Sequence, residues 1–206
     1  MKTQPDALVI DLDGVIRHFD PDVRAPQEAA AGLDAGAVHA VAFERHLLQP
    51  ALIGQHSHDQ WAQGIAEGLV DKHGLAPVAA HALVDQWMSY RGEVDPTALA
   101  FVAEVRAAGV PVALATNATT RLDADLRLLG LADAFDVVVN SSVVGVHKPT
   151  REYFKVVCDA LRRPAERCLF VDDDDRNVRG ARAAGLSAYR WTSDADLPYL
   201  RAALGL

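Results

Sequence analysis

Cysteine is scarce in this sequence, which contains two cysteines among 206 residues. Cys158 and Cys168 are too few for a disulfide framework, and nothing around them has the spacing of zinc ligands. We therefore expect buried, reduced thiols and a cytoplasmic protein, because a reducing compartment keeps such thiols free.

Long apolar runs are missing as well. No run approaches the roughly 18 to 20 apolar residues that cross a bilayer, and the apolar stretch at 7–12 is interrupted by the charge of Asp11. We therefore expect neither a signal peptide nor a membrane-spanning segment.

An excess of basic residues is also lacking, since the formal net charge is −8. Nucleic acids and anionic membrane surfaces bind basic patches, so we expect neither as a partner. The rest of the composition is that of a globular protein, with 50% hydrophobic and 23% charged residues. A chain of this length forms one large domain, or a core that carries a smaller insert.

The hydrophobic pattern predicts an α/β core. From about residue 97 onward, short β-branched runs alternate with helical patterns, and one similar run lies near the N-terminus. The predicted strands cover 7–12, 110–115, 137–140, 168–171 and 187–191. One predicted helix covers 97–108, and others begin near residues 120, 150 and 175. This alternation indicates a doubly wound parallel sheet with helices on both faces.

Residues 17–95 show only helical patterns. Ser57 and Gln60 form a capping box, and Pro77 suits the first turn of a further helix. A third helix is expected over 37–48, ended by Pro50. We predict an all-helical unit at 17–95, inserted into a core made of 1–16 and 96–206. Seven of the eight histidines lie in this insert, where we expect them on helix surfaces.

Two carboxylates follow the first predicted strand. Asp11 and Asp13 are two residues apart, so the alternation of a strand sends both to the same side. Ligands of open α/β sheets bind at this carboxyl edge. At ~4 Å and an effective dielectric constant near 20, two such charges repel by roughly 4 kcal/mol. We therefore expect a cation or a shared proton there, although one aspartate could simply cap the turn at Gly14.

Three further motifs lie at or just beyond strand ends. Thr116 and Asn117 end the second strand, Lys148 precedes Pro149 and a helix, and the acidic run 172–175 follows a buried strand. Each motif alone has an ordinary explanation as a helix cap, a Lys-Pro pair or a solvated acidic loop. Together they would bring hydrogen-bond donors, a fixed cation and oxygen ligands around one point.

These four motifs, in this order, resemble those of the haloacid dehalogenase (HAD) superfamily over nearly the whole chain, and the insert resembles its small helical cap. The resemblance implies a Rossmann-like core with Asp11 as nucleophile and metal ligand. Asp13 would be the general acid/base, with its backbone carbonyl on the metal. The resemblance also implies a phosphate-binding set and an acidic Mg²⁺-binding pair: Thr116, Asn117 and Lys148 for phosphate, Asp173 as direct ligand and Asp172 behind it, with Asn177 as a polar neighbour.

The implied activity is Mg²⁺-dependent hydrolysis of a small phosphorylated metabolite through an aspartyl-phosphate, by a monomer or a homodimer. Asp13 favours phosphate, because dehalogenases of the superfamily lack a carboxylate at that position. A sugar phosphomutase shares the core and stays open, as do a phospho-acceptor signalling domain and a non-catalytic binding homologue. Arg17 and His18, the first side chains past the motif, are candidate substrate contacts unless they merely face solvent. We read Asp174 and Asp175 as helix-start residues.

Overall fold

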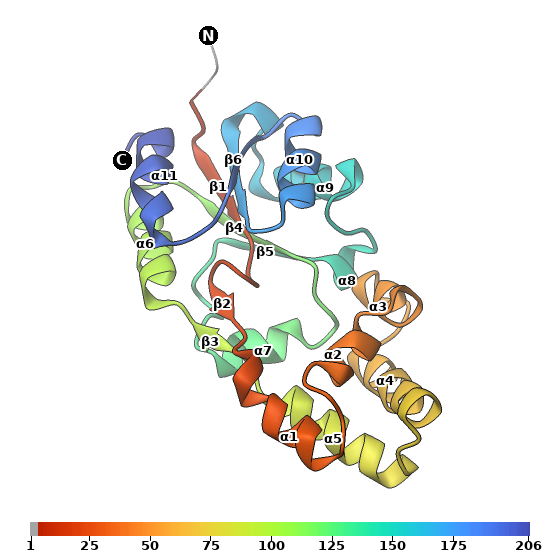
Figure 1. Ribbon diagram of the computed structural model, residues 1–206. Helices are drawn as coiled ribbons and strands as arrows, with labels where there is room; N and C mark the ends of the chain where they lie inside the picture. Colours follow the sequence, from red (N-terminus) through yellow and green to blue (C-terminus); the bar gives the residue numbers. More distant parts are fainter. Residues whose placement is uncertain (1–3) are drawn as a thin grey trace.

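A five-stranded parallel sheet forms the centre of the computed structural model, which describes residues 4–206 (Figure 1). Its strands run in the order β5-β4-β1-β6-β7. They comprise β1 (Ala7–Ile10), β4 (Val112–Thr116), β5 (Val137–Asn140), β6 (Cys168–Asp172) and β7 (Ser187–Arg190). The connections leave β1 toward β4 and β5 on one side and toward β6 and β7 on the other. The carboxyl end of β1 therefore lies at a topological switch point, where ligands bind.

Helices cover both faces of the sheet because successive strand residues point to opposite sides. Leu8 and Ile10 pack in the core on one face, with α6 (Pro96–Ala107), α7 (Leu122–Leu128) and α11 (Leu197–Leu204). Ala7 and Val9 pack in the core on the other face, with α9 (Arg151–Leu161) and α10 (Asp175–Ala183). This arrangement confirms the predicted doubly wound core. The short helix α8 (Ser141–Val144) follows β5.

A helical segment leaves the sheet just after β1 and lies beyond the end of that strand (Figure 1). It holds the 3₁₀ turn η1 (Pro21–Val23) and five helices, α1 (Ala25–Ala30), α2 (Ala37–Ala42), α3 (Arg45–Leu52), α4 (His58–His73) and α5 (Pro77–Ser89). These helices share a separate hydrophobic core that includes Trp61, Ile65 and Leu69. We call η1 to α5 the helical insert. The capping box of Ser57 and the first-turn position of Pro77 are as expected.

Two short strands join the insert to the sheet and were not expected. β2 (Arg17–His18) and β3 (Glu93–Val94) pair antiparallel, so the chain enters and leaves the insert side by side. Strands of two residues are too short to show alternation, which explains why the sequence pattern did not indicate them.

The helix expected over 37–48 is wrong. The chain breaks it at Glu44, whose extended backbone (φ −62°, ψ 133°) begins α3 instead, and Pro50 lies inside α3. The indole Nε1 of Trp61 donates to the carbonyl of Ala42 at 3.0 Å, which satisfies one of the backbone groups left open where α2 ends. None of the helices within residues 4–206 has both the length and the apolar character needed to cross a membrane.

Candidate active site

Three strand ends and one loop bring polar side chains to the carboxyl edge of the sheet. Asp11 follows β1, Thr116 ends β4, Lys148 follows α8, and Asp172 ends β6. All four side chains are buried, with Asp172 fully inaccessible and Lys148 only 2% exposed. The sequence-predicted residues of three strand ends and one loop are therefore brought together.

Lys148 bridges two buried carboxylates. Its Nζ lies 2.7 Å from Oδ1 of Asp11 and 2.7 Å from Oδ2 of Asp172. Burial alone would lower the pKa of Lys148, but the two carboxylates raise it above its usual value. Burial raises the pKa of Asp11 well above its usual range, an effect that Lys148 opposes. Two carboxylates against one ammonium leave this group with an excess of negative charge, which favours a further cation.

A divalent cation fits the acidic side of this group. Carboxylate oxygens of Asp11, Asp172 and Asp173 lie within 4.8 Å of one another. Asp172 is already engaged, because it accepts from Lys148, from the Asp174 N–H at 2.8 Å and from Asn177 Nδ2 at 3.1 Å. Asp11 is engaged through Oδ1, which contacts Lys148 and accepts from the Leu12 N–H at 2.7 Å. Its Oδ2 and the oxygens of Asp173 are therefore more available than those of Asp172, and carboxylate oxygens are the donors that Mg²⁺ prefers.

Gly14 allows Asp173 to approach the first motif. A Cβ at residue 14 would lie 2.3 Å from Oδ2 of Asp173, and the backbone there has a φ of +86°. Both the close contact and the left-handed conformation favour glycine. Burial and then the neighbouring Asp172 raise the pKa of Asp173, which agrees with a position suited to a cation.

Asn117 holds the loop that carries Lys148. Its Oδ1 accepts from the Lys148 N–H at 2.8 Å, and its Nδ2 donates to the Lys148 carbonyl at 3.0 Å. Thr116 is buried beside it, and its carbonyl accepts from the Tyr153 hydroxyl at 3.3 Å. In this geometry the amide of Asn117 positions Lys148. Phosphate binding by Thr116 and Asn117 stays a prediction.

Asp13 is paired with Arg17. Nε and Nη2 of Arg17 lie 2.6 and 3.0 Å from the two oxygens of Asp13, and Nη1 lies 3.5 Å from Asp125. Arg17 is only 5% exposed, so it does not face solvent. His18 is exposed and lies 3.6 Å from Asp95 at the entrance to the insert. Substrate contacts by either residue stay predictions.

The comparisons with known proteins decide the family. The model of haloacid dehalogenase-like hydrolases matches residues 5–185. This chain belongs to that family. A phosphatase of Mycobacterium tuberculosis (strain CDC 1551 / Oshkosh) is 35% identical over 195 residues, which cover 89% of this chain and 85% of that protein. The phosphoserine phosphatase of Thermus thermophilus is 34% identical over 123 residues, which span 58% of this chain and about half of that protein, 49%.

Solved HAD structures share the fold. A HAD family enzyme of Bacteroides thetaiotaomicron, in complex with magnesium and inorganic phosphate, matches with a TM-score of 0.74 at 20% identity, over 95% of this chain and 98% of that chain. At such identity the likeness establishes the fold alone. The predicted family and the Rossmann-like HAD core are confirmed. The prediction of an enzyme of the phosphatase type agrees with the relatives.

The helical insert of this HAD-like hydrolase contacts the loop after β4 through His58. The His58 N–H donates to Oγ1 of Thr120 at 2.9 Å, and Nδ1 lies 2.9 Å from Oγ1 of Thr119. His58 is only 8% exposed, so the expectation of surface histidines is wrong at this position. The contact joins residues 61 or more positions apart, and no local sequence signal could have indicated it.

His58 should make stability depend on pH. Burial, with help from Arg121, lowers the pKa of His58 from 6.5 to about 4. Between these two values the unfolded chain binds more protons, so this contribution to stability is lost as the pH falls from 6.5 toward 4. The full shift would be worth roughly 3 kcal/mol, and hydration at the junction should reduce it to about 1–2 kcal/mol.

We therefore expect His58→Asn to be less stable than the wild type at pH 7.5, and the difference to shrink by about 1 kcal/mol at pH 5. Urea unfolding at the two pH values measures it. His81→Asn, at an exposed position of α5, is the control for the loss of an imidazole elsewhere in the insert. A difference at His58 that is equal at both pH values would contradict the assignment.

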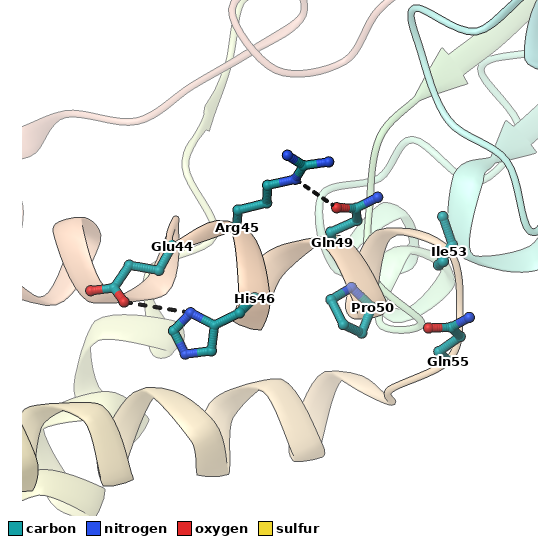
Figure 2. A pocket seen from close by; sticks show the side chains of 7 residues that line it. All are labelled: Glu44, Arg45, His46, Gln49, Pro50, Ile53 and Gln55. Atoms are coloured by element: carbon teal, nitrogen blue, oxygen red, sulfur yellow. Dashed lines mark hydrogen bonds and ion pairs between the residues drawn. The ribbon is translucent and has the colours of Figure 1, made fainter.

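A pocket on the helical insert does not share these features. Figure 2 shows its lining along α3, with Arg45, Gln49, Pro50 and Ile53. Its charged groups already have partners within the insert, because Arg45 donates to Gln49 at 3.0 Å and Glu44 contacts Lys72 and His46. The group around Lys148 is therefore the better candidate for chemistry.

Proposed function

We propose that this HAD-like hydrolase is a Mg²⁺-dependent phosphatase that acts on a small phosphorylated metabolite through an aspartyl-phosphate on Asp11. One observation carries the proposal: Lys148 lies between Asp11 and Asp172 at the carboxyl edge, with Asp13 two residues beyond Asp11. This arrangement offers a nucleophile, a cation for phosphate and a proton donor around one point. Relatives named as phosphatases support it.

The reaction would proceed in two displacements on phosphorus. Asp11 attacks in line, the bond between phosphorus and the ester oxygen breaks, and the leaving alkoxide takes a proton from Asp13. Water then attacks the phosphorus of the aspartyl-phosphate and gives its proton to Asp13. The bond between phosphorus and the Asp11 oxygen breaks, so phosphate is released and Asp11 is restored. Lys148 would counter the negative charge of the phosphoryl oxygens in both steps, since phosphoryl transfer depends mainly on positioning and charge.

The residues that would hold Mg²⁺ are Asp11 and Asp173, with the backbone carbonyl of Asp13 and with Asp172 behind them. The available carboxylate oxygens match the donors that this ion takes. When bound, Mg²⁺ would neutralise charge on the phosphoryl group and so permit a dianion beside four aspartates. Such an ion would lie on the acidic side, because Lys148 contacts Asp11 and Asp172 on the other.

A dehalogenase is the rival that would use the same aspartate nucleophile, Asp11. Asp13 favours phosphate, because an alkoxide leaving group needs a proton and a halide does not. A sugar phosphomutase needs the same proton transfers and differs in where the phosphoryl group goes. Release of inorganic phosphate with multiple turnovers, and without a second sugar as acceptor, would separate the two. A monomeric or dimeric state and a cytoplasmic location stay predictions.

Phosphate release from a panel of phosphorylated metabolites should require Mg²⁺. EDTA should reduce the rate to background, and added Mg²⁺ should restore it, because a phosphate dianion is repelled from this acidic edge without the ion. Ca²⁺ should inhibit, since its longer bonds and looser geometry misplace the reacting groups. Undiminished turnover in EDTA, or halide release from haloacids in place of phosphate release, would contradict the proposal.

A further inference from the structure

Three arginines converge on Asp125 beside the candidate active site. Nη1 of Arg17 and Nε of Arg91 lie 3.5 Å from its oxygens, and Nε of Arg121 lies 3.2 Å away. They come from three places: the start of β2, the segment between α5 and β3, and the N-cap of α7. We call Arg17, Arg91 and Arg121 the arginine cluster. Asp125 is 7% exposed, so the cluster surrounds a buried carboxylate.

The arginine cluster has more positive charge than its contacts balance. Within these ion pairs, three guanidinium groups face two carboxylates, Asp125 and Asp13. The contacts with Asp125 measure 3.2 to 3.5 Å, longer than the roughly 2.7–2.9 Å of a strong charge-assisted hydrogen bond. One carboxylate shared among three guanidiniums therefore leaves donor capacity for another anion.

Two members of the cluster are partly exposed. The side chains of Arg91 and Arg121 are 26% and 24% exposed, whereas Arg17 is buried. A purely structural role, in which the cluster joins the insert to the core, would explain some of the contacts. Arg91 and Arg121 also donate to the Met88 carbonyl at 2.8 and 3.3 Å. Such a structural role does not require an excess of charge, which adds a cost when the groups are partly desolvated.

Arg17 connects the cluster to the proton donor of the proposed reaction. The same guanidinium that contacts Asp125 holds both oxygens of Asp13. Asp13 would protonate the ester oxygen of the substrate, so an anion bound at the cluster would be separated from that oxygen by a short carbon chain.

We propose that the arginine cluster binds a second oxyanion, a carboxylate or a second phosphate, on the alcohol part of the substrate. This inference rests on the proposed phosphatase function and narrows its substrates to phosphate esters of small hydroxy acids or to small bisphosphates. Guanidinium groups bind both oxyanions in bidentate fashion. The loop after β4, the entrance to the insert and its exit then select the substrate together.

Matched esters test the proposal. The substrates are 2-hydroxyethyl phosphate, phosphoglycolate and ethane-1,2-diol bisphosphate, which share a two-carbon alcohol part and differ in the second group. At constant ionic strength, the wild type should favour at least one anionic ester over the neutral one by about tenfold or more in kcat/KM, the effect of one hydrogen bond to a charged group. Which anionic ester is favoured distinguishes carboxylate from phosphate.

Arg121→Gln and Arg91→Gln should each lower that ratio of anionic to neutral kcat/KM by about tenfold, and Arg121→Lys should recover part of it. Arg127→Gln, at an exposed position of the same helix as Arg121, should keep the wild-type ratio. A ratio near one in the wild type, or a ratio that neither glutamine variant changes, would overturn the proposal.

A measurement on the wild type alone tests the proposal even if the variants fail to fold. Glycolate should inhibit hydrolysis of an aryl phosphate competitively at concentrations where ethylene glycol has no effect. Equal inhibition by the two would overturn the anion site while leaving phosphatase activity established. Absence of phosphate release from every ester would instead overturn the proposed function, and this inference with it.

Discussion

Asp11→Asn should abolish phosphate release, with a loss on the order of 10⁴-fold or more, the scale on which enzymes lose rate when a nucleophile is removed. The amide keeps the shape of the carboxylate but lacks its charge and cannot form the aspartyl-phosphate. The fold should persist, because Lys148 keeps its contact with Asp172. Burial already raises the pKa of Asp11, so loss of this charge should leave the thermal midpoint unchanged or slightly higher.

Phosphate release and thermal unfolding, measured on the same preparation, check both parts. Asp71→Asn, at an exposed position on α4, is the matched control and should retain wild-type turnover. A complementary measurement is mass spectrometry of the wild type quenched during turnover, which should locate one phosphoryl group on the peptide that contains Asp11. More than a few per cent of wild-type activity in Asp11→Asn would exclude covalent catalysis by this residue.

The sequence allowed prediction of those parts of the site that depend on strand ends. The apolar run before Asp11 and the run before Asp172 fix where two parallel strands finish, and parallel strands finish at the same edge. The distance between Lys148 and both aspartates follows from that topology, together with the motif order typical of the family. The alternation of strand and helix patterns along the chain was therefore enough to predict which strand ends share an edge.

Other parts of the site depend on contacts between segments that no local pattern links. Phosphate binding by Asn117 stays a prediction, but the contact of its amide with the backbone of Lys148, 31 residues away, was not expected. Asp125 lies in the helix expected to begin near residue 120, yet it contacts Arg17 and Arg91, which lie just before and just after the helical insert, as well as the neighbouring Arg121. Such pairings depend on how distant segments pack together, which the hydrophobic periodicity of one segment does not predict.

Helix ends also differ in whether neighbouring residues or distant residues satisfy their backbone groups. Ser57 begins α4 by its own side chain, so the local pattern was sufficient. At the break between α2 and α3, the carbonyl of Ala42 accepts from the indole of Trp61 in α4, 19 residues away. Pro50 was expected to end a helix, but it lies inside α3, and the chain breaks earlier, between α2 and α3. Sequence signals therefore predict a helix end when neighbouring residues satisfy its free backbone N–H or C=O groups.

Asp173→Asn should weaken Mg²⁺ binding by at least tenfold and lower kcat/KM by roughly 10²-fold at fixed Mg²⁺, since it removes one of the two available carboxylates. Asp175→Asn is the matched control two residues along the same acidic run. Asp175 begins α10 and pairs with Arg179 at the surface, so its substitution should cost little activity. Titration calorimetry with Mg²⁺ and steady-state kinetics measure the two effects separately, and equal losses in both variants would show that the acidic run has been misassigned.

Gly14→Ala tests the same site without changing any charge. The added methyl group would lie 2.3 Å from Oδ2 of Asp173, so the carboxylate must move, and φ at this position is unfavourable for alanine. Asp173 would keep its charge but lose its position.

If the position of Asp173 matters, Gly14→Ala should weaken Mg²⁺ binding as Asp173→Asn does. Excess Mg²⁺ should restore part of the rate, since the ligand is still present. Gly32→Ala, where φ is also positive but no atom lies within 4 Å of the added Cβ, separates backbone strain from displacement of Asp173. If both glycine variants bind Mg²⁺ as the wild type does, the approach of Asp173 to the first motif is not what builds the metal site.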